Sequence, residues 1–203
     1  MIKRILSFDC ANRSLAVCCV TINIHDNKDT NSCNWLIGDH VKINTLKVFD
    51  LTKGKKVNTV DRASLLKKCL TDIDIMLLDE DLKINTVLVE YQMSANDKSR
   101  CVSQQILYHY SCLPGVNVEL IGPTLKNKVC FSSDSSLEHG TFMAKYASKY
   151  TANKNHSKSN FLYWIKRQGI SKLIQENNIP KKNVDDVADA FMQICGWLIF
   201  GKG

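Results

Sequence analysis

The chain has 203 residues, of which 44% are hydrophobic, and a formal net charge of +7. This length and apolar content suit one globular domain with a sizeable core. No apolar run approaches the roughly 20 residues that cross a bilayer, and the N-terminal residues lack the long apolar stretch of a secretory signal. We therefore expect a soluble intracellular protein with no membrane partner, in the cytoplasm, the nucleus or a mitochondrion.

The positive charge is concentrated in the second half of the chain. Residues 1–90 contain 13 Lys or Arg and 12 Asp or Glu, whereas residues 91–203 contain 14 and 8. The stretch 140–182 contains nine basic residues and one acid. A basic region of this kind suits a polyanion such as nucleic acid, although a Lys-rich face is often merely solvated.

Nine cysteines are present, an odd number, and no two of them form a CxxC pair. Several lie within apolar runs, as Cys10, Cys69 and Cys195 do. We interpret them as reduced thiols of the core rather than as a disulfide framework or a zinc site.

Hydrophobic periodicity and turn-forming residues divide the chain into alternating strand and helix patterns. Polar or Ser-rich segments at 25–34, 122–140 and 151–157 are expected to be loops. In chain order the patterns predict strands at 3–9, 16–24 and 42–51, a helix at 61–78, a strand at 84–90, a helix at 98–113, a strand at 116–121, and helices at 141–150, 158–168 and 183–200.

Acidic residues recur where the predicted strands end. Asp9 closes the first strand and Glu90 closes the fourth. In the last helix Asp186 and Asp189 are three residues apart and share one face, and Asp185 and Asp189, four apart, would share a face as well. A carboxylate at the end of a buried strand is costly unless it is paired or binds a cation.

Carboxylates that converge from two strands and a helix would form a hard-oxygen site, which Mg²⁺ or Mn²⁺ prefers. Two such ions can activate a water and stabilise the leaving oxygen in phosphodiester cleavage. Each acid also has an ordinary explanation. A single acid at a strand end is usually a turn former or an ion-pair partner, and Asp185 and Asp186 could simply stabilise the helix N-terminus with Asn183 as its cap.

Four stretches together resemble the RNase H-like superfamily, and within it the RuvC-type Holliday junction resolvases, including those of poxviruses and mitochondria. ILSFDCANRSLAV is similar to the first-strand motif, with Asn12 and Ser14 where a Gly is usual. VLVEYQMSANDKSRCVSQQ resembles the central strand ending in Glu and the helix that follows it. NKNHSKSNFLYWI resembles a basic helix start, and VDDVADAF the closing Asp-x-x-Asp-Ala motif.

This resemblance covers nearly the whole chain and implies an α/β fold, an RNase H-like mixed five-stranded sheet flanked by helices, in a single domain over 1–203. Extra length lies near 25–42 and 122–157. The resemblance also implies a resolvase of the viral or mitochondrial type. Such an enzyme is a Mg²⁺-dependent endonuclease that cuts four-way DNA junctions symmetrically and leaves 5′ phosphates. The implied site comprises two Mg²⁺ ions, with Mn²⁺ as a substitute, held by Asp9, Glu90, Asp186 and Asp189, and Lys158 beside the scissile phosphate.

Several roles stay open. Lys126 and Lys128 are plausible phosphate contacts, and Lys158 could equally be one more cation of a basic stretch. Tyr163 and Trp164 are expected to pack in the core. The resemblance implies a homodimer that uses the helix at 98–113. The alternatives are another RNase H-like nuclease, acting on RNA–DNA hybrids, and a module that binds nucleic acid without cleaving it.

Overall fold

The computed structural model describes residues 1–24, 33–38, 40–54, 56–79, 83–92, 96–132 and 135–201. Within them lies a five-stranded sheet with strand order β3–β2–β1–β4–β5. Strand β1 is antiparallel to β2 and parallel to β4, so the sheet is mixed. The strands are β1 (Ile2–Cys10), β2 (Ser14–Asn23), β3 (Val41–Asp50), β4 (Thr86–Glu90) and β5 (Asn117–Ile121).

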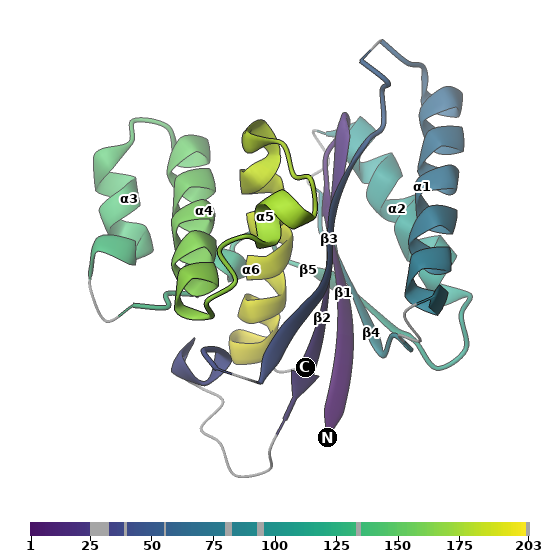
Figure 1. The fold of residues 1–203 in the computed structure, drawn as a ribbon. Coiled ribbons are helices and arrows are strands. Elements are labelled where there is room, and N and C mark those ends of the chain that lie inside the picture. The colour runs from purple at the N-terminus through teal and green to yellow at the C-terminus, as the bar shows by residue number, and fades with distance from the viewer. Residues whose placement is uncertain are drawn as a thin grey trace.

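Helices cover both faces of this sheet (Figure 1). Helices α1 (Thr59–Asp79) and α2 (Asp97–Ser111) lie on one face, and α6 (Val184–Phe200) lies on the other with α4 (Lys149–Arg167) outside it. The short remaining elements on that second side are α3 (His139–Lys145), which packs on α4, α5 (Leu173–Glu176), and the 3₁₀ turns η1 (Cys33–Leu36), η2 (Leu125–Lys128), η3 (Ser135–Leu137) and η4 (Lys181–Asn183).

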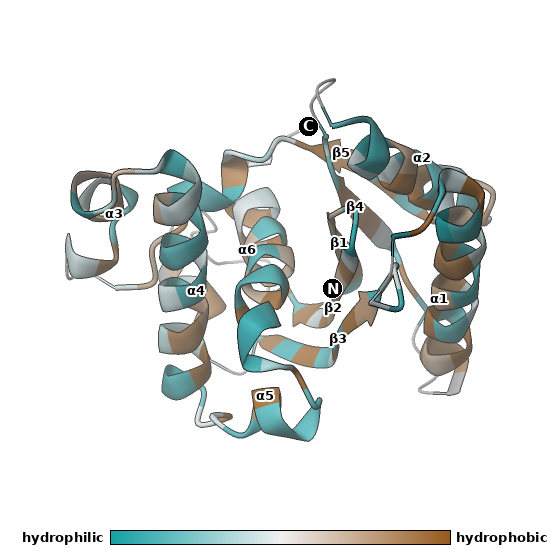
Figure 2. Cartoon of the chain, turned by 90° about the horizontal axis from the view of Figure 1, so that it is seen from above, coloured by the Kyte–Doolittle hydropathy of each residue, from teal (hydrophilic) through white to brown (hydrophobic). Residues whose placement is uncertain are grey.

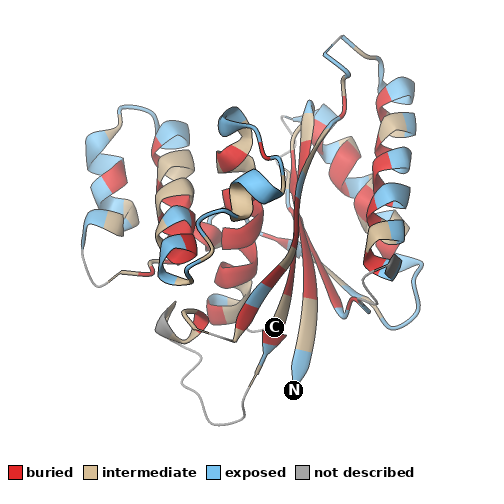
Figure 3. Cartoon of the chain, in the orientation of Figure 1, coloured by how far each residue is buried: buried red, intermediate tan, exposed pale blue. Residues whose placement is uncertain are grey.

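The two helical layers bury two separate hydrophobic cores, because successive strand residues point to opposite faces. Leu6 and Phe8 of β1 pack with α1 and α2, whereas Ile5 packs with α4 and α6. Figure 2, which views the sheet from above, shows the hydrophobic residues of the helices turned toward it, and Figure 3 shows the same surfaces buried. No helix among the described residues has the length and apolarity needed to cross a membrane.

The expected α/β fold with a mixed five-stranded sheet is confirmed, as is the core position of Trp164, which is fully buried. Two boundary predictions are wrong. The helix expected at 141–150 is α3, which ends at Lys145. Residues 151–157 are not a turn but the second and third turns of α4, which begins at Lys149 after Ser148 accepts a hydrogen bond from the Thr151 amide. Of the expected loop at 25–34, residues 25–32 lie outside the described part of the chain.

The two stretches of extra length are partly described. Residues 33–38 hold the turn η1, whose Leu36 carbonyl accepts a hydrogen bond from the Trp164 indole at 2.8 Å. Residues 122–157 are more ordered than their Ser-rich sequence predicts, since they hold η2, η3, α3 and the first half of α4.

Candidate active site

Strand alternation places Asp9 and Glu90 on the same face of the sheet. In β1, Ile5, Ser7 and Asp9 face α6, whereas Leu6 and Phe8 face the opposite helices. In β4, Leu88 belongs to the α6 side, and Glu90, two residues later, shares its orientation. Because β1 and β4 are parallel neighbours, both carboxylates lie at one edge of the sheet, and both are buried.

Helix α6 runs antiparallel to β1 and brings Asp189 to that edge. Gln193, one turn further along α6, accepts a hydrogen bond from Ser7 Oγ at 3.0 Å, so the helix and the strand are tied together next to the acids. Asp189 is 3% exposed. The three residues that the sequence analysis singled out from separate elements therefore converge.

The first of two lysines, which is half-buried, ties these acids together. Lys154 of α4 places its Nζ 2.8 Å from Asp189 Oδ2, 3.0 Å from Asp186 Oδ1 and 3.6 Å from Asp9 Oδ2. It thus links carboxylates that come from β1 and from α6.

The second lysine is Lys126, in the turn η2 that follows β5. Its Nζ lies 3.0 Å from Glu90 Oε1 and 3.1 Å from Asp189 Oδ2. Lys126 is 6% exposed, so both ion pairs are buried. Gln92 donates to the other Glu90 oxygen at 3.1 Å and orients that carboxylate.

Asp186 lies closer to this cluster than Asp185. The Asp186 carboxylate accepts hydrogen bonds from Asn183 at 3.1 Å and from Ser14 at 3.4 Å, in addition to its ion pair with Lys154. Asp185 Oδ2 is 3.9 Å from the Lys154 ammonium and is more exposed. Asp186 lines the cavity beside the cluster, and Asp185 does not.

That cavity has a volume of about 320 Å³. We call it the acidic cavity. The site residues Asp9, Glu90, Asp186, Asp189, Lys126 and Lys154 all line it, together with residues of the β1–β2 turn and the first turn of α2.

Burial and charge shift the pKa values of these groups in different directions. Burial, reinforced by the charge of Glu90, raises the pKa of Asp9 well above its usual range. Burial also acts to raise the pKa of Asp189, but the ammonium groups of Lys126 and Lys154 outweigh it, and the pKa is lowered. A further cation bound beside Asp9 would therefore stabilise the ionised form of this carboxylate.

Both lysines keep their charge. Burial tends to lower their pKa values, but the surrounding carboxylates outweigh it and raise both above the ordinary value. For Lys126 the leading carboxylate is Asp189, and for Lys154 it is Asp9. Two permanent positive charges therefore face the acidic cavity at neutral pH.

The donor set fits a divalent cation. Carboxylate oxygens are the ligands that Mg²⁺ and Mn²⁺ prefer. Among the described residues Asp189 Oδ1 is buried without a hydrogen-bond partner of normal geometry, although the Ser157 hydroxyl is near enough to lower the pKa of Asp189. Within the described part of the chain no three His, Cys, Asp or Glu side chains are arranged so that they could coordinate one metal ion. The two lysine ammonium groups lie between the carboxylates.

Two lysines named from the sequence lie elsewhere. Lys158 follows Lys154 by one turn of α4, is half-buried, does not line the acidic cavity and forms no ion pair with a described residue. Lys128 places its ammonium 5.7 Å from the ring centre of Phe200, away from the acids. The lysine that the sequence analysis missed is Lys154, because it falls in the segment expected to be a turn; Ser148, a possible helix cap, was the available signal.

Comparison with known proteins gives a match in structure only, since the sequence matches no protein-family model and no curated protein. The fowlpox virus resolvase, solved with Holliday junction DNA, aligns with a TM-score of 0.56 at 15% identity over 96% of each chain. Thermus thermophilus RuvC aligns with a TM-score of 0.54 at 16% identity, over 99% of this chain and 97% of that one. The yeast mitochondrial Holliday junction resolvase aligns with a TM-score of 0.54 at 16% identity, over 97% of this chain and 79% of that one.

These three structures align with the present one along almost its whole length, and the acids predicted from the sequence meet at one edge of its sheet. The chain therefore has the fold of the RuvC-type Holliday junction resolvases.

Proposed function

We propose that this protein is a divalent-metal-dependent endonuclease that resolves four-way DNA junctions. The observation that carries the proposal is the convergence of Asp9, Glu90, Asp186 and Asp189 with two lysine ammonium groups around one cavity. The structures with the same fold include a viral, a bacterial and a mitochondrial protein, each described as a Holliday junction resolvase or as RuvC.

In this mechanism Asp9, Glu90, Asp186 and Asp189 would hold Mg²⁺, with Mn²⁺ as a substitute. When bound, such an ion would supply the acidity that activates a water and the charge that stabilises the leaving 3′ oxygen, so that cleavage would leave a 5′ phosphate. Asp189 is held ionised by Lys126 and Lys154, so it is ready as a ligand at neutral pH. The raised pKa of Asp9 means that its ionised form becomes more favourable once a cation is bound.

In this mechanism Lys154 and Lys126, rather than Lys158, are the cations beside the scissile phosphate. Their charges are permanent and face the acidic cavity, so a phosphodiester in that cavity meets two fixed cations. Preorganised charge of this kind stabilises the negative charge that develops on the phosphoryl oxygens in the transition state.

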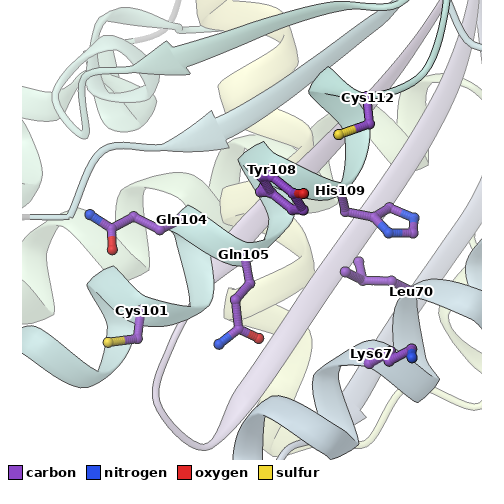
Figure 4. Close-up of a pocket in the computed structure, with 8 residues that line it drawn as sticks. All are labelled: Lys67, Leu70, Cys101, Gln104, Gln105, Tyr108, His109 and Cys112. Carbon is purple, nitrogen blue, oxygen red and sulfur yellow. The ribbon is translucent and has the colours of Figure 1, made fainter.

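A four-way junction has two symmetric strands to cut, which a two-fold dimer would match. We propose that α2 forms that dimer. Its outer side, with α1, lines a largely apolar groove of about 550 Å³, in which Cys101, Tyr108 and Cys112 come from α2 and Leu70 from α1 (Figure 4). Tyr108 is 76% exposed in the isolated chain and would be covered in such a dimer.

The test is cleavage of a labelled synthetic four-way junction in the presence of Mg²⁺. The wild-type protein should make paired, symmetric nicks, and Asp9→Asn and Asp189→Asn should each lower the rate on the order of a thousandfold, because a metal ligand is lost. Asp72→Asn, which makes the same change on the exposed side of α1, should cleave at the wild-type rate.

The same assay run with linear duplex and with an RNA–DNA hybrid decides the substrate. A preference for the hybrid would overturn the junction assignment and leave a hybrid nuclease. A protein that binds branched DNA but never cleaves it, with or without the two Asp→Asn changes, would refute the nuclease and leave a binding module.

A further inference from the structure

A second cavity, of about 400 Å³, lies next to the acidic cavity and has the opposite charge. Four cationic side chains line it, and they come from four separate segments: Arg13 from the β1–β2 turn, Lys56 from the loop after β3, Arg62 from the first turn of α1 and Lys98 from the first turn of α2. We call it the basic cavity. In Figure 1 the turn and the loop lie together at the upper edge of the sheet, where α1 begins.

Among the described residues no Asp or Glu lines the basic cavity, and Arg13, Lys56 and Lys98 form no ion pair. Two acids of the flanking segments are engaged elsewhere. Asp50 accepts hydrogen bonds from the Thr52 and Gly54 amides, and Asp97 pairs with Arg100 at 2.8 Å.

Arg62 forms the rigid wall of the cavity. It is 7% exposed, and its Nε donates to the Asn12 carbonyl at 2.9 Å while Nη2 donates to the Val57 carbonyl at 3.4 Å. A guanidinium has five N–H groups, so others remain without an acceptor among the described residues. A buried cation with no carboxylate partner is costly, and an anion in the cavity would offset that cost.

The basic cavity and the acidic cavity are lined by neighbouring residues of two segments. Ala11 of the β1–β2 turn lines the acidic cavity, and the next two residues, Asn12 and Arg13, line the basic one. At the start of α2, Ser99 lines the acidic cavity and Lys98 the basic one. A polyanion held at the acids can therefore reach the basic cavity without leaving this edge of the sheet.

A third cavity, of about 500 Å³, adjoins the basic cavity. Arg13 lines both of them, and Lys182, Asn183 and one acid, Asp50, also line the third. Asn183 donates a hydrogen bond to Asp186 of the active site. A single DNA strand carries one phosphate for each 3.4 Å of helix axis, so a strand that passes this edge of the sheet presents several phosphates to these cations.

We propose that the basic cavity binds a backbone phosphate of the DNA a few nucleotides from the bond that is cut. This inference rests on the proposed function, because it takes the acidic cavity as the place of cleavage. The ligand is a phosphodiester, bound by Arg13, Lys56 and Lys98 against the fixed guanidinium of Arg62. Its role is to set the position of the strand relative to the metal ligands.

The test measures binding of a labelled four-way junction across a range of salt concentrations, with Asp9→Asn as the parent so that no cleavage occurs. Each lost phosphate contact should reduce the slope of log affinity against log salt by about 0.9. Arg13→Ala and Lys56→Ala should each show that reduction and bind several-fold more weakly. Both side chains are exposed, so the substitutions should not unfold the protein. Lys42→Ala, an exposed lysine near the other end of β3, removes the same charge and should leave the slope unchanged.

Junctions that carry one neutral methylphosphonate, placed in turn at each linkage near the cut, give a second readout. The parent should lose affinity at a particular linkage, and Lys56→Ala should lose less affinity there, because one of the cations that contact this phosphate is already missing. Equal losses in the parent and in Lys56→Ala at every linkage, or an equal slope change in Lys42→Ala, would overturn the proposal. Wild-type cleavage, followed in parallel, separates the two ideas: cleavage with unchanged slopes refutes the basic cavity alone, whereas a parent without affinity for DNA refutes both.

Discussion

Lys154 holds the acidic cluster together, because its ammonium lies against carboxylates from β1 and from α6. Buried acids of like charge repel one another, and the burial of Asp9 makes its ionised form still less favourable. A fixed cation between them removes much of that cost. In the proposed reaction the same charge would also face the phosphate, so Lys154 would contribute both to stability and to catalysis.

We expect Lys154→Ala to lower the rate of junction cleavage about 100-fold, as for the loss of one preorganised charge in a transition state. Without divalent ions it should also lower the free energy of unfolding by about 3 kcal/mol, because buried carboxylates lose their partner. Urea unfolding with and without Mg²⁺ checks this, since Mg²⁺ should restore most of the loss. Lys158→Ala is the matched control on the same helix. Full loss of cleavage in Lys158→Ala with normal cleavage in Lys154→Ala would return the catalytic role to Lys158.

His156, two residues after Lys154, is fully buried, and neither ring nitrogen has a hydrogen-bond partner among the described residues. Burial, with the nearby His139, lowers its pKa to about 4. An unfolded chain binds the proton near pH 6.5. Between pH 6.5 and 4 the unfolded state therefore binds a proton that the folded state does not bind. As the pH falls through this window, the free energy of unfolding decreases.

The expected loss is up to about 1.4 kcal/mol for each pH unit over that window, or about 3 kcal/mol in all. Urea unfolding at pH 7, 6 and 5 measures it for the wild type and for His156→Phe, and the difference between the two isolates this residue from the acids. Parallel pH profiles in the two proteins would contradict the prediction.

Among the elements, α6 and η2 are held unusually close. Gly196 of α6 faces the backbone of η2, and a Cβ at this position would lie 2.9 Å from the Leu125 carbonyl. The residue that follows Leu125 is Lys126, whose ammonium lies between Glu90 and Asp189. A glycine in the middle of a helix is unfavourable by itself, so its value here is the close approach that it permits.

Gly196→Ala should push η2 away from α6 and move Lys126 off the two carboxylates. We expect a loss of about 1–3 kcal/mol in the free energy of unfolding, as for other overpacked sites, and slower cleavage with little change in DNA affinity. Gly140→Ala in α3 is the control, since a Cβ there meets nothing within 4 Å. Gly196→Ala with wild-type stability and cleavage would show that η2 adapts freely.

At the scale of the whole molecule, the two faces of the sheet carry different surface features. The α6 side carries the acids and lysines, and the α1–α2 side carries the exposed apolar groove of Figure 4. A dimer formed through α2 would leave both active sites open, because the groove and the acidic cavity belong to different surfaces of the molecule.

Light scattering should give a dimer mass at micromolar concentration, and Tyr108→Glu should give a monomer, because a charge in an apolar interface is costly. The monomer should still bind junction DNA but lose the paired symmetry of its nicks. Leu162→Glu, on the exposed side of α4, should remain dimeric. A wild-type protein that is monomeric under these conditions would contradict the dimer.

The sequence predicts much of the fold and of the acid set because those features depend on local pattern. The alternation within β1 and β4 and the spacing of Asp186 and Asp189 follow from periodicity alone. The boundaries of α4 were predicted poorly because its buried side includes His156, Ser157 and Asn160, which do not look apolar in sequence.

By itself the sequence determined the order of strands and helices and which acids end the strands, since backbone geometry decides on which face each side chain lies. Only the tertiary structure decided which cations join those acids. Lys126 and Lys154 lie 28 residues apart in the chain and meet only where η2 and α4 pack against α6. The basic cavity is likewise assembled from three distant parts of the chain, the β1–β2 turn, residues 56–62 and the start of α2, and charge counted along a chain cannot show where such parts come together.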